Sequence, residues 1–325
     1  MNFDIDIVYA WADGNCLTHQ ALYRQKFGRD ATYCRFATNH ELYYSLYSIA
    51  QFAPWVRNVF IIVAAYQRPN LDHLPRLILE KIIFVEEDEI LPKEALPVFN
   101  SMAIETCLYR IPGLAEHFIY FNDDMFFGRE VTPSDFFSET GECFALVNQL
   151  PKQNKVNIPS HDWLIDFLQT MGVYQQFIIH EGGVLDLSWI DKLLHQCYPC
   201  RKSILAFMAN HEIIHPAIRR TTFSAGRQSD NIKTIHLMYL IGQLLNLIQL
   251  KKWDSERFIL LTDHHPLIAR LKLFWITMKQ PKLFCINNDL KKENHRIETI
   301  LRLFFRQFYH PKKNSIPHSE NGLTT

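Results

Sequence analysis

His117-Phe-Ile-Tyr-Phe-Asn-Asp-Asp124 is the most informative stretch of this sequence. A mostly β-favouring run that ends in Asn122, Asp123 and Asp124 predicts a buried strand with two acids at its end. In an open α/β sheet, ligands bind beyond the carboxyl ends of the strands. Two adjacent carboxylates repel each other unless a cation neutralises them, and Mg²⁺ binds carboxylates together with substrate phosphates. The pattern indicates a metal-dependent site for a phosphorylated or nucleotide-activated substrate; a solvated acidic turn is the alternative.

Other strand and helix patterns alternate around this stretch. Strands are predicted over residues 5–11, 58–64 and 81–85, and helices over residues 38–52 and 100–110. Alternation of this kind is typical of βαβ units with right-handed crossovers. The predicted fold class is therefore α/β, a mostly parallel sheet with flanking helices and a helical C-terminal half.

A polar connection over residues 149–160, which contains Pro151 and Pro159, separates the two halves. We expect residues 1–150 to form the α/β portion and residues 151–310 a mainly helical portion that completes the site. Helices are predicted over residues 187–196, 232–251, 266–278 and 294–309, with a short strand over residues 283–286. The polar tail, residues 311–325, is expected to be disordered.

Composition narrows the class of protein. The 325 residues carry 34 basic and 34 acidic side chains, and this zero net charge argues against nucleic-acid binding. No apolar run reaches the roughly 20 residues that span a bilayer, and the acidic N-terminus is unlike a signal peptide. Seven cysteines, an odd number, favour reduced thiols. We expect a cytoplasmic protein, and leave open a peripheral place at the inner face of the membrane.

Several polar residues near predicted strand and helix ends are candidate ligands. Asp13 follows the first strand, where an acid beside a glycine can approach a nucleotide, although Asp-Gly is also a common turn. Arg35, Asn39 and Glu41 precede or begin a helix, whose free N–H groups attract phosphate. Thr38 and Glu41 have the spacing of a capping box, so helix capping is the alternative for them.

The second half offers a base and a cation. His180 precedes two glycines and could deprotonate an attacking hydroxyl, whereas a structural role is the alternative in a chain with 15 histidines. Arg227 lies before a predicted helix and could hold a phosphate by a bidentate contact; an ordinary surface arginine is the alternative. Asp230, or Ser229, is a candidate N-cap for that helix.

Two further patterns have a structural explanation. Cys197, Cys200, His211 and His215 have spacing close to that of a zinc finger, but Tyr198-Pro199 and the helix-like linker fit no strong zinc template. The basic and aromatic helix over residues 294–309 could lie on an anionic membrane. Docking of its apolar face onto the protein is favoured instead.

Taken together, the motifs resemble those of the Stealth family of sugar-1-phosphate transferases. Asp6-Ile-Val-Tyr-Ala-Trp-Ala-Asp-Gly14 resembles its first conserved region. Three stretches resemble the second conserved region of the family: Glu41-Leu-Tyr-Tyr-Ser-Leu-Tyr-Ser-Ile49, Leu96-Pro-Val-Phe-Asn-Ser101 and Phe121-Asn-Asp-Asp-Met125. Weaker likenesses to the third and fourth regions lie at His180, at residues 227–230 and at residues 284–289.

The resemblance implies a glycosyltransferase-A-like fold in which residues 1–150 bind a nucleotide sugar. It further implies transfer of hexose 1-phosphate, of the N-acetylhexosamine type, from a UDP-sugar to a hydroxyl of a glycan acceptor, with release of UMP. Mg²⁺ or Mn²⁺ is the implied cofactor, held by Asp123 and Asp124. His180, Asp13 and Arg227 take the catalytic places, and the substrate-binding places fall on Arg35, Asn39, Glu41, Asn100, Asn122 and Asp230.

Some positions depart from the family pattern. Thr38-Asn39-His40 stands where an acid-containing stretch is usual, and Tyr66 replaces a glycine. Two other functions therefore remain open: a metal-dependent glycosyltransferase, and a non-catalytic relative that binds nucleotide sugars.

Overall fold

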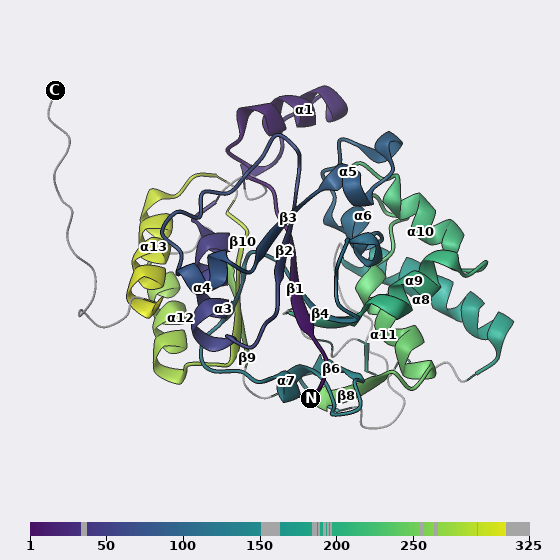
Figure 1. Ribbon diagram of the computed structural model, residues 1–325. Coiled ribbons are helices and arrows are strands. Elements are labelled where there is room, and N and C mark those ends of the chain that lie inside the picture. Colours follow the sequence, from purple (N-terminus) through teal and green to yellow (C-terminus); the bar gives the residue numbers. More distant parts are fainter. Residues whose placement is uncertain are drawn as a thin grey trace, which may run out of the picture.

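The fold is a central sheet with helices packed on both sides, as the computed structural model in Figure 1 shows. The structure describes residues 1–33, 38–150, 163–183, 187, 189, 190, 193, 195, 197–253, 256–262, 266–290 and 292–309. The predicted disordered tail and the predicted boundary near residue 150 lie outside these ranges or at their margin, and both stay predictions.

The main sheet has the strand order β3-β2-β1-β4-β7. Its strands are β1 (Ile5–Ala10), β2 (Val59–Val63), β3 (Ile82–Glu86), β4 (His117–Phe121) and β7 (Tyr198–Arg201). The first four run parallel, and β7 pairs antiparallel with β4. The predicted α/β class is confirmed, and the C-terminal half adds an edge strand to the sheet of the N-terminal half.

The chain changes direction across the sheet between β1 and β4. It passes from β1 to β2 and β3 on one side and then returns to β4 on the other side of β1. Tyr9 is paired with Phe121, so the two strands end at the same level. A reversal of strand order of this kind opens a crevice at the carboxyl ends of the strands, where ligands bind in α/β proteins.

Two small sheets extend the fold. One has the order β5-β10-β9, formed by β5 (Met125–Phe127), β10 (Leu283–Asn288) and β9 (Glu256–Leu261), and the other pairs β6 (Cys143–Val147) with β8 (Ile248–Lys252). The helix predicted over residues 232–251 is therefore wrong in its second half. Asn246, with a left-handed φ of 57°, separates the helix from β8, a conformation that asparagine tolerates well.

Helices cover both faces of the main sheet. The short turns are η1 (Lys93–Ala95) and η2 (Leu108–Arg110), so the helix predicted over residues 100–110 is α6 followed by η2. In the region predicted as a helix over residues 187–196, no described residue is in an α-helix. No helix among the described residues is long and apolar enough to cross a membrane. The helices are α1 (Leu17–Phe27), α3 (Glu41–Phe52), α4 (Arg76–Leu79), α5 (Glu87–Ile90), α6 (Ser101–Glu105), α7 (Pro133–Phe136), α8 (Trp163–Glu181), α9 (Lys202–Asn210), α10 (His215–Thr222), α11 (Thr234–Leu244), α12 (Pro266–Lys279) and α13 (His295–Tyr309).

Helix α3 fixes the strand that follows the two acids. Leu42, Leu46 and Ile49 recur at helical spacing and are buried against the sheet. On the same helix, Ser45 Oγ donates to the carbonyl of Met125 at 2.5 Å, and Ser48 Oγ accepts from the N–H of Phe127 at 3.1 Å. Because both partners belong to β5, the helix holds the chain immediately after Asp124 in place.

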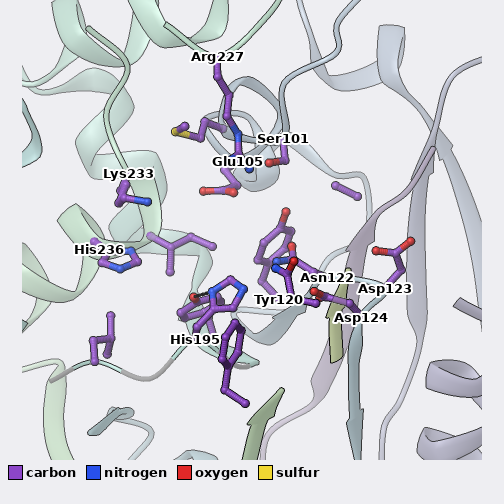
Figure 2. Close-up of a pocket in the computed structure, with 17 residues that line it drawn as sticks. Ser101, Glu105, Tyr120, Asn122, Asp123, Asp124, His195, Arg227, Lys233 and His236 are labelled. Carbon is purple, nitrogen blue, oxygen red and sulfur yellow. Dashed lines mark hydrogen bonds between the residues drawn. The ribbon is translucent and has the colours of Figure 1, made fainter. Parts of the chain in front are cut away.

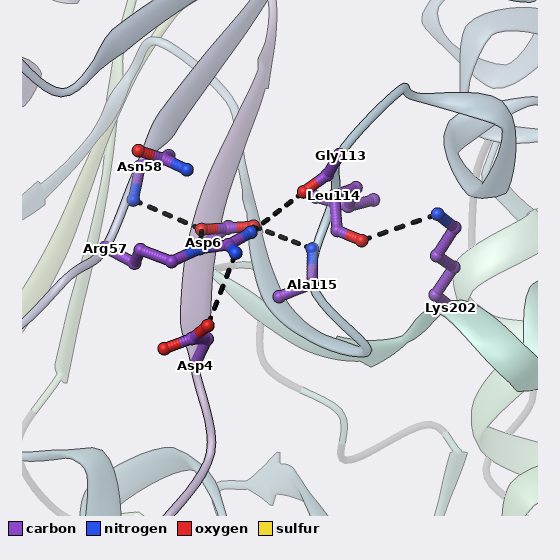
Figure 3. Close-up of polar contacts among 8 residues, drawn as sticks. All are labelled: Asp4, Asp6, Arg57, Asn58, Gly113, Leu114, Ala115 and Lys202. Atoms are coloured by element: carbon purple, nitrogen blue, oxygen red, sulfur yellow. Dashed lines mark hydrogen bonds and ion pairs between the residues drawn. The ribbon is translucent and has the colours of Figure 1, made fainter.

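At the opposite, N-terminal end of the sheet, a buried acid ties three segments together (Figure 3). Asp6 of β1 is fully buried, and its carboxylate accepts hydrogen bonds from Nε and Nη2 of Arg57 at 2.9 and 2.5 Å. It also accepts from the N–H groups of Asn58 at 3.1 Å and Ala115 at 2.7 Å. These segments lead into β2 and β4, so Asp6 organises the starts of the strands that flank β1.

Candidate active site

A cavity of about 710 Å³ lies at the crevice between β1 and β4 (Figure 2). Ala10 from the end of β1 and Asn122, Asp123 and Asp124 from the end of β4 line one part of it. The remaining lining comes from α6, from β4 itself, from β7 and the segment before it, from residues 227–236 and from β9 and β10. These residues are Ser101, Met102, Glu105, Tyr120, Leu193, His195, Tyr198, Arg227, Lys233, Ile235, His236, Phe258 and Asn287. The structure therefore has a cavity where the sequence predicts the site, and Asn122, Asp123, Asp124 and Arg227 are the predicted site residues that line it.

The charged forms of the two acids at the end of β4 are destabilised by burial and by neighbouring carboxylates. Burial and the charges of Asp124 and Glu41 raise the pKa of Asp123 to about 8. Burial and Glu41 likewise raise the pKa of Asp124 to about 6, against a hydrogen bond from Cys285 that lowers it. Because neighbouring like charges disfavour ionisation, a bound cation would stabilise the charged form of all three carboxylates.

The surroundings of Asp124 fit a divalent ion. Its Oδ1 atom is buried and has no hydrogen-bond partner among the described residues, while Oδ2 accepts from Sγ of Cys285 at 3.4 Å. Ligand atoms of Asp124, His195 and Cys285 all lie within 4.8 Å of one another. Figure 2 shows Asn122 and Asp124 on the side of His195, whereas the side chain of Asp123 points away from them. A buried carboxylate oxygen without a partner suits Mg²⁺ or Mn²⁺, which prefer oxygen ligands, whereas an imidazole ligand would favour a transition metal over Mg²⁺.

Cations lie across the cavity from the acids. Figure 2 shows Arg227 and Lys233 on the wall opposite the ends of β1 and β4. The segment that carries them is held by Asn100, whose Nδ2 donates to Oδ1 of Asn231 at 2.9 Å and whose Oδ1 caps α6 at the N–H of Met102. Asn100 was predicted to bind substrate; its observed contacts instead position the segment of Arg227.

Two imidazoles in the cavity are held neutral. Burial and the charges of Lys233 and Arg227 lower the pKa of His195 to about 4, and burial lowers that of His236 further below its usual range. Although His195 is an exposed residue that lines the cavity, its ring contacts Phe258, and its Nδ1 atom lies 3.2 Å from the hydroxyl of Tyr198. A neutral imidazole can accept a proton or bind a metal ion.

Glu105 lies between the cations and the floor of the cavity. Burial raises its pKa to about 7, although Lys233 and Arg227 oppose this shift. The buried hydroxyl of Tyr120, which also lines the cavity, has no hydrogen-bond partner among the described residues. Glu105 is thus a second group in the cavity that can exchange a proton near neutral pH.

His180, the predicted general base, does not line this cavity. It ends α8 on the surface, where Nδ1 lies 2.8 Å from Oε1 of Glu181 and Nε2 lies 2.9 Å from Oε1 of Glu212. Both ring nitrogens are thereby engaged with carboxylates. The structure thus places His180 in a surface ion-pair cluster, whereas the described histidines that line the cavity are His195 and His236. A catalytic role for His180 is not supported by this position and stays a prediction.

Four other predicted site residues, Glu41, Asn39, Asp13 and Asp230, do not line the cavity. Glu41 is close enough to affect both acids of β4, but its carboxylate also accepts from the N–H of Asn39 at 2.5 Å, as expected of a helix cap. Asp13 and Asp230 are not among the lining residues of the cavity: Asp13 is bound to Gln67 through its backbone, and Asp230 forms an ion pair with Arg220 at 3.3 Å. Arg35 lies outside the described residues.

The zinc-finger spacing does not form a metal site. Cys200 lies in β7 with its thiol bound to the carbonyl of Tyr198 at 3.2 Å, and His215 binds the carbonyl of Ala209 at 2.7 Å. His211 contacts Glu181. No candidate metal group in the described part of the chain joins these residues to Cys197. The zinc-finger-like spacing arises because β7, which carries Cys200, is followed directly by α9, and His211 and His215 come after that helix.

Several cavity residues went unpredicted. His195, Lys233 and His236 lie in or next to segments without a recognisable motif. Asn287 and Cys285 stood in a stretch that resembles the fourth conserved region, and this was the only signal for them. Glu105 lies within the helix predicted over residues 100–110 but gave no chemical signal, because a lone acid inside a helical pattern is usually a surface residue.

Comparisons of the sequence with known proteins identify the family of this chain. Residues 35–144 match conserved region 2 of the Stealth proteins. The capsular polysaccharide phosphotransferase cps12A of Actinobacillus pleuropneumoniae is 39% identical over 92% of this chain and 81% of the relative. The chain belongs to the Stealth family.

Other relatives overlap less completely with this Stealth protein. The exopolysaccharide phosphotransferase SCO6023 of Streptomyces coelicolor is 32% identical over 99% of this chain, which spans 54% of that relative. Among solved structures, the galactosyltransferase LgtC is 11% identical with a TM-score of 0.44, covering 94% of this chain and 95% of that one. Mouse xyloside xylosyltransferase 1 gives 10% identity and a TM-score of 0.40, covering 87% and 96%.

Proposed function

We propose that this Stealth protein transfers a sugar 1-phosphate, of the hexose or N-acetylhexosamine type, from a UDP-sugar to a hydroxyl of a glycan acceptor. The transfer forms a phosphodiester, releases UMP and serves the synthesis of a cell-surface polysaccharide. One observation carries the proposal: a single cavity at the crevice between β1 and β4 has acids on one wall, cations on the other and a neutral imidazole between them. The names of cps12A and SCO6023 as phosphotransferases support it.

The cations are suited to a diphosphate. Arg227 presents a planar guanidinium that can bind two phosphate oxygens at once, and Lys233 adds a second positive charge. Because phosphoryl transfer depends mainly on positioning and charge stabilisation, these two side chains would supply much of the rate enhancement from the protein itself. Asn100 and Asn231 keep their segment in register with α6.

The divalent ion belongs on the opposite wall. Asp124 and Asp123 would hold Mg²⁺ or Mn²⁺, with His195 and Cys285 close to Asp124. When bound, the ion neutralises charge on the diphosphate and on the departing UMP.

His195 is the group proposed to take the proton from the acceptor hydroxyl. In the free protein, Lys233 and Arg227 help to keep its pKa low. A diphosphate bound to these cations would cancel part of their effect and make the imidazole more basic when the substrate is present. General-base assistance of this kind contributes about 10²–10⁴-fold in rate. Glu105 is the alternative base in the same cavity.

The nucleotide product tests the proposal. Purified protein is incubated with several UDP-sugars, Mg²⁺ and candidate oligosaccharides, and the released nucleotide is identified. UMP together with a phosphodiester-linked product supports the proposal. Release of UDP would mean transfer of the sugar alone, and nucleotide binding without turnover over the panel would mean a non-catalytic relative. Arg227→Ala should reduce turnover at least 100-fold, by the order of magnitude of a lost charge-stabilising donor, while Arg76→Ala on exposed α4 should not.

A further inference from the structure

The outer layer formed by α12 and α13 has an unusual surface. The two helices pack side by side over the β5-β10-β9 sheet (Figure 1). Ala269, Leu273 and Ile276 of α12 are buried toward this sheet, as expected for a covering helix. The opposite face should be polar, because the outer face of such a helix meets water.

That outer face is apolar instead. Leu267, Leu271, Phe274 and Met278 are 57%, 61%, 60% and 65% exposed. Their spacing of four, three and four residues places them in one stripe along the helix. Scattered exposed apolar residues are normal, but a continuous stripe marks a surface that another body covers.

The exposed charged side chains of α12 and α13 are mostly cationic, and an exposed acid, Glu293, lies just before α13. Helix α12 contains Arg270, Lys272 and Lys279 and no acidic residue. On α13, Arg296, Arg302 and Arg306 are exposed, while its acid, Glu298, is 7% exposed and accepts a hydrogen bond from Tyr33. The chain as a whole has no net charge, so these cations are concentrated on one layer.

We propose that the α12 stripe and the cations of α12 and α13 bind the surface of an anionic lipid bilayer. An apolar stripe flanked mostly by cations is the pattern of a helix that lies in a membrane interface, with its apolar side chains in the headgroup region and its cations at anionic headgroups. Self-association is disfavoured, because a twofold contact would bring this cationic layer against an identical one. The β5-β10-β9 sheet also supplies Phe258 and Asn287 to the cavity, so the bilayer would lie behind the wall of the site.

Vesicle binding of the full chain tests the proposal. Protein is mixed with vesicles of phosphatidylcholine alone, or with about 30 mol% phosphatidylglycerol, and the bound fraction is measured by flotation at ~0.1 M salt. We expect binding to the anionic vesicles that weakens in higher salt. Leu271→Ser/Phe274→Ser should lower the partition constant at least tenfold, on the order expected for two exposed apolar side chains. Arg270→Gln/Lys279→Gln should lower it roughly tenfold on anionic vesicles alone.

A matched control uses exposed apolar residues elsewhere. Leu17 on α1 and Ile179 on α8 are 80% and 75% exposed, so Leu17→Ser/Ile179→Ser should leave vesicle binding unchanged. Absence of wild-type binding to anionic vesicles, or equal binding by the Leu271→Ser/Phe274→Ser variant, would overturn the proposal. A dimer detected by light scattering and lost in that variant would also overturn it, because the stripe would then bind a second copy. None of these residues lines the cavity, so UMP release from soluble substrates should be the same in every variant and tests the proposed function separately.

Discussion

The two ends of the main sheet hold buried acids in opposite ways. At the amino end, the Asp6 carboxylate accepts four hydrogen bonds, two of them from the guanidinium of Arg57. At the carboxyl end, Asp124 has one oxygen bound only by a thiol and the other without a partner among the described residues, beside the second acid Asp123. Asp6 lies on β1, and Asp124 directly follows the neighbouring strand β4. The two acids therefore belong to the same sheet, and only their local hydrogen-bond partners differ.

The difference separates structural from functional acids. A buried charge that is fully paired costs little to keep and strongly destabilises the fold when its partner is removed. An acid pair without a cation raises the free energy of the folded state until something positive binds. Sites for ligands are commonly built at such a cost, and mutation should therefore affect the two ends in opposite directions.

The largest expected effect is on turnover. Asp124→Asn should reduce UMP release by about 10³-fold or more, equivalent to roughly 4 kcal/mol, because the amide cannot replace a charged metal ligand. The free energy of unfolding without metal at pH ~8 should stay equal or rise, because a like charge beside Asp123 is removed. Initial rates and urea unfolding measure the two quantities. Asp72→Asn, an exposed acid far along the chain, is the control. Lost stability together with lost turnover would make Asp124 a structural acid like Asp6.

The second effect is on stability alone. Asp6→Ala removes the partner of Arg57 and leaves two backbone N–H groups unsatisfied, so the free energy of unfolding should fall by about 3 kcal/mol. Asp4→Ala removes a 65% exposed contact of the same arginine and should cost under about 0.5 kcal/mol. Urea unfolding measures both. Nucleotide binding by the folded fraction of Asp6→Ala should be normal; a selective loss of binding would contradict the contrast between the two ends.

Prediction from sequence succeeded where a single short segment contains both the secondary-structure element and the polar residues that follow it. The strand over residues 117–121 and the acids after it were predicted from adjacent residues, and the structure confirms both. The parallel sheet also followed from alternating patterns, since each βαβ unit is local.

It failed where the site depends on contacts between distant segments. His195 and Cys285 reach Asp124 only because β7 pairs with β4 and β10 pairs with β5, and neither pairing can be read from local periodicity. His180 was chosen from its neighbouring glycines, but α8 ends at the surface and directs it to Glu212. The same short-range view left a zinc site possible from the spacing of Cys197 and Cys200, which lie at β7, to His211 and His215, which lie beyond α9.

A third, smaller effect concerns the loop opposite the acids. Asn100→Ala removes the amide that joins α6 to Asn231 and so loosens the segment of Arg227. We expect KM for the UDP-sugar to rise about tenfold with a smaller change in kcat, on the order of the 1–2 kcal/mol that a buried hydrogen-bonded cap contributes. Asn70→Ala, in an exposed turn, is the control. Unchanged KM would mean that Arg227 is held without this amide.

The smallest effect is the dependence of stability on pH without metal. The folded-state pKa values of Asp123, Asp124 and Glu105, about 8, 6 and 7, lie above the roughly 4 of unfolded carboxyls, so the folded protein binds more protons. Their stabilisation is full at low pH and is lost as pH rises toward 8. His195 has the opposite sign, because its pKa is lowered to about 4, and its contribution rises until about pH 7.5, one unit above the pKa of an unfolded histidine. It therefore offsets part of the loss only below about pH 7.5.

Between pH ~6.5 and ~8.5 the free energy of unfolding should therefore fall, by on the order of 1 kcal/mol after allowance for water in the cavity. Thermal unfolding across this range measures the slope. Asp123→Asn/Asp124→Asn should flatten it, leaving the share of Glu105 and of Glu87, whose pKa burial also raises to about 7. Mg²⁺ should stabilise the wild type more at pH ~8 than at pH ~6.5, because protons compete with the metal for the same oxygens. A slope unchanged by the double variant would mean that the acids of β4 are compensated in the free protein, as Asp6 is, and the contrast between the two ends of the sheet would disappear.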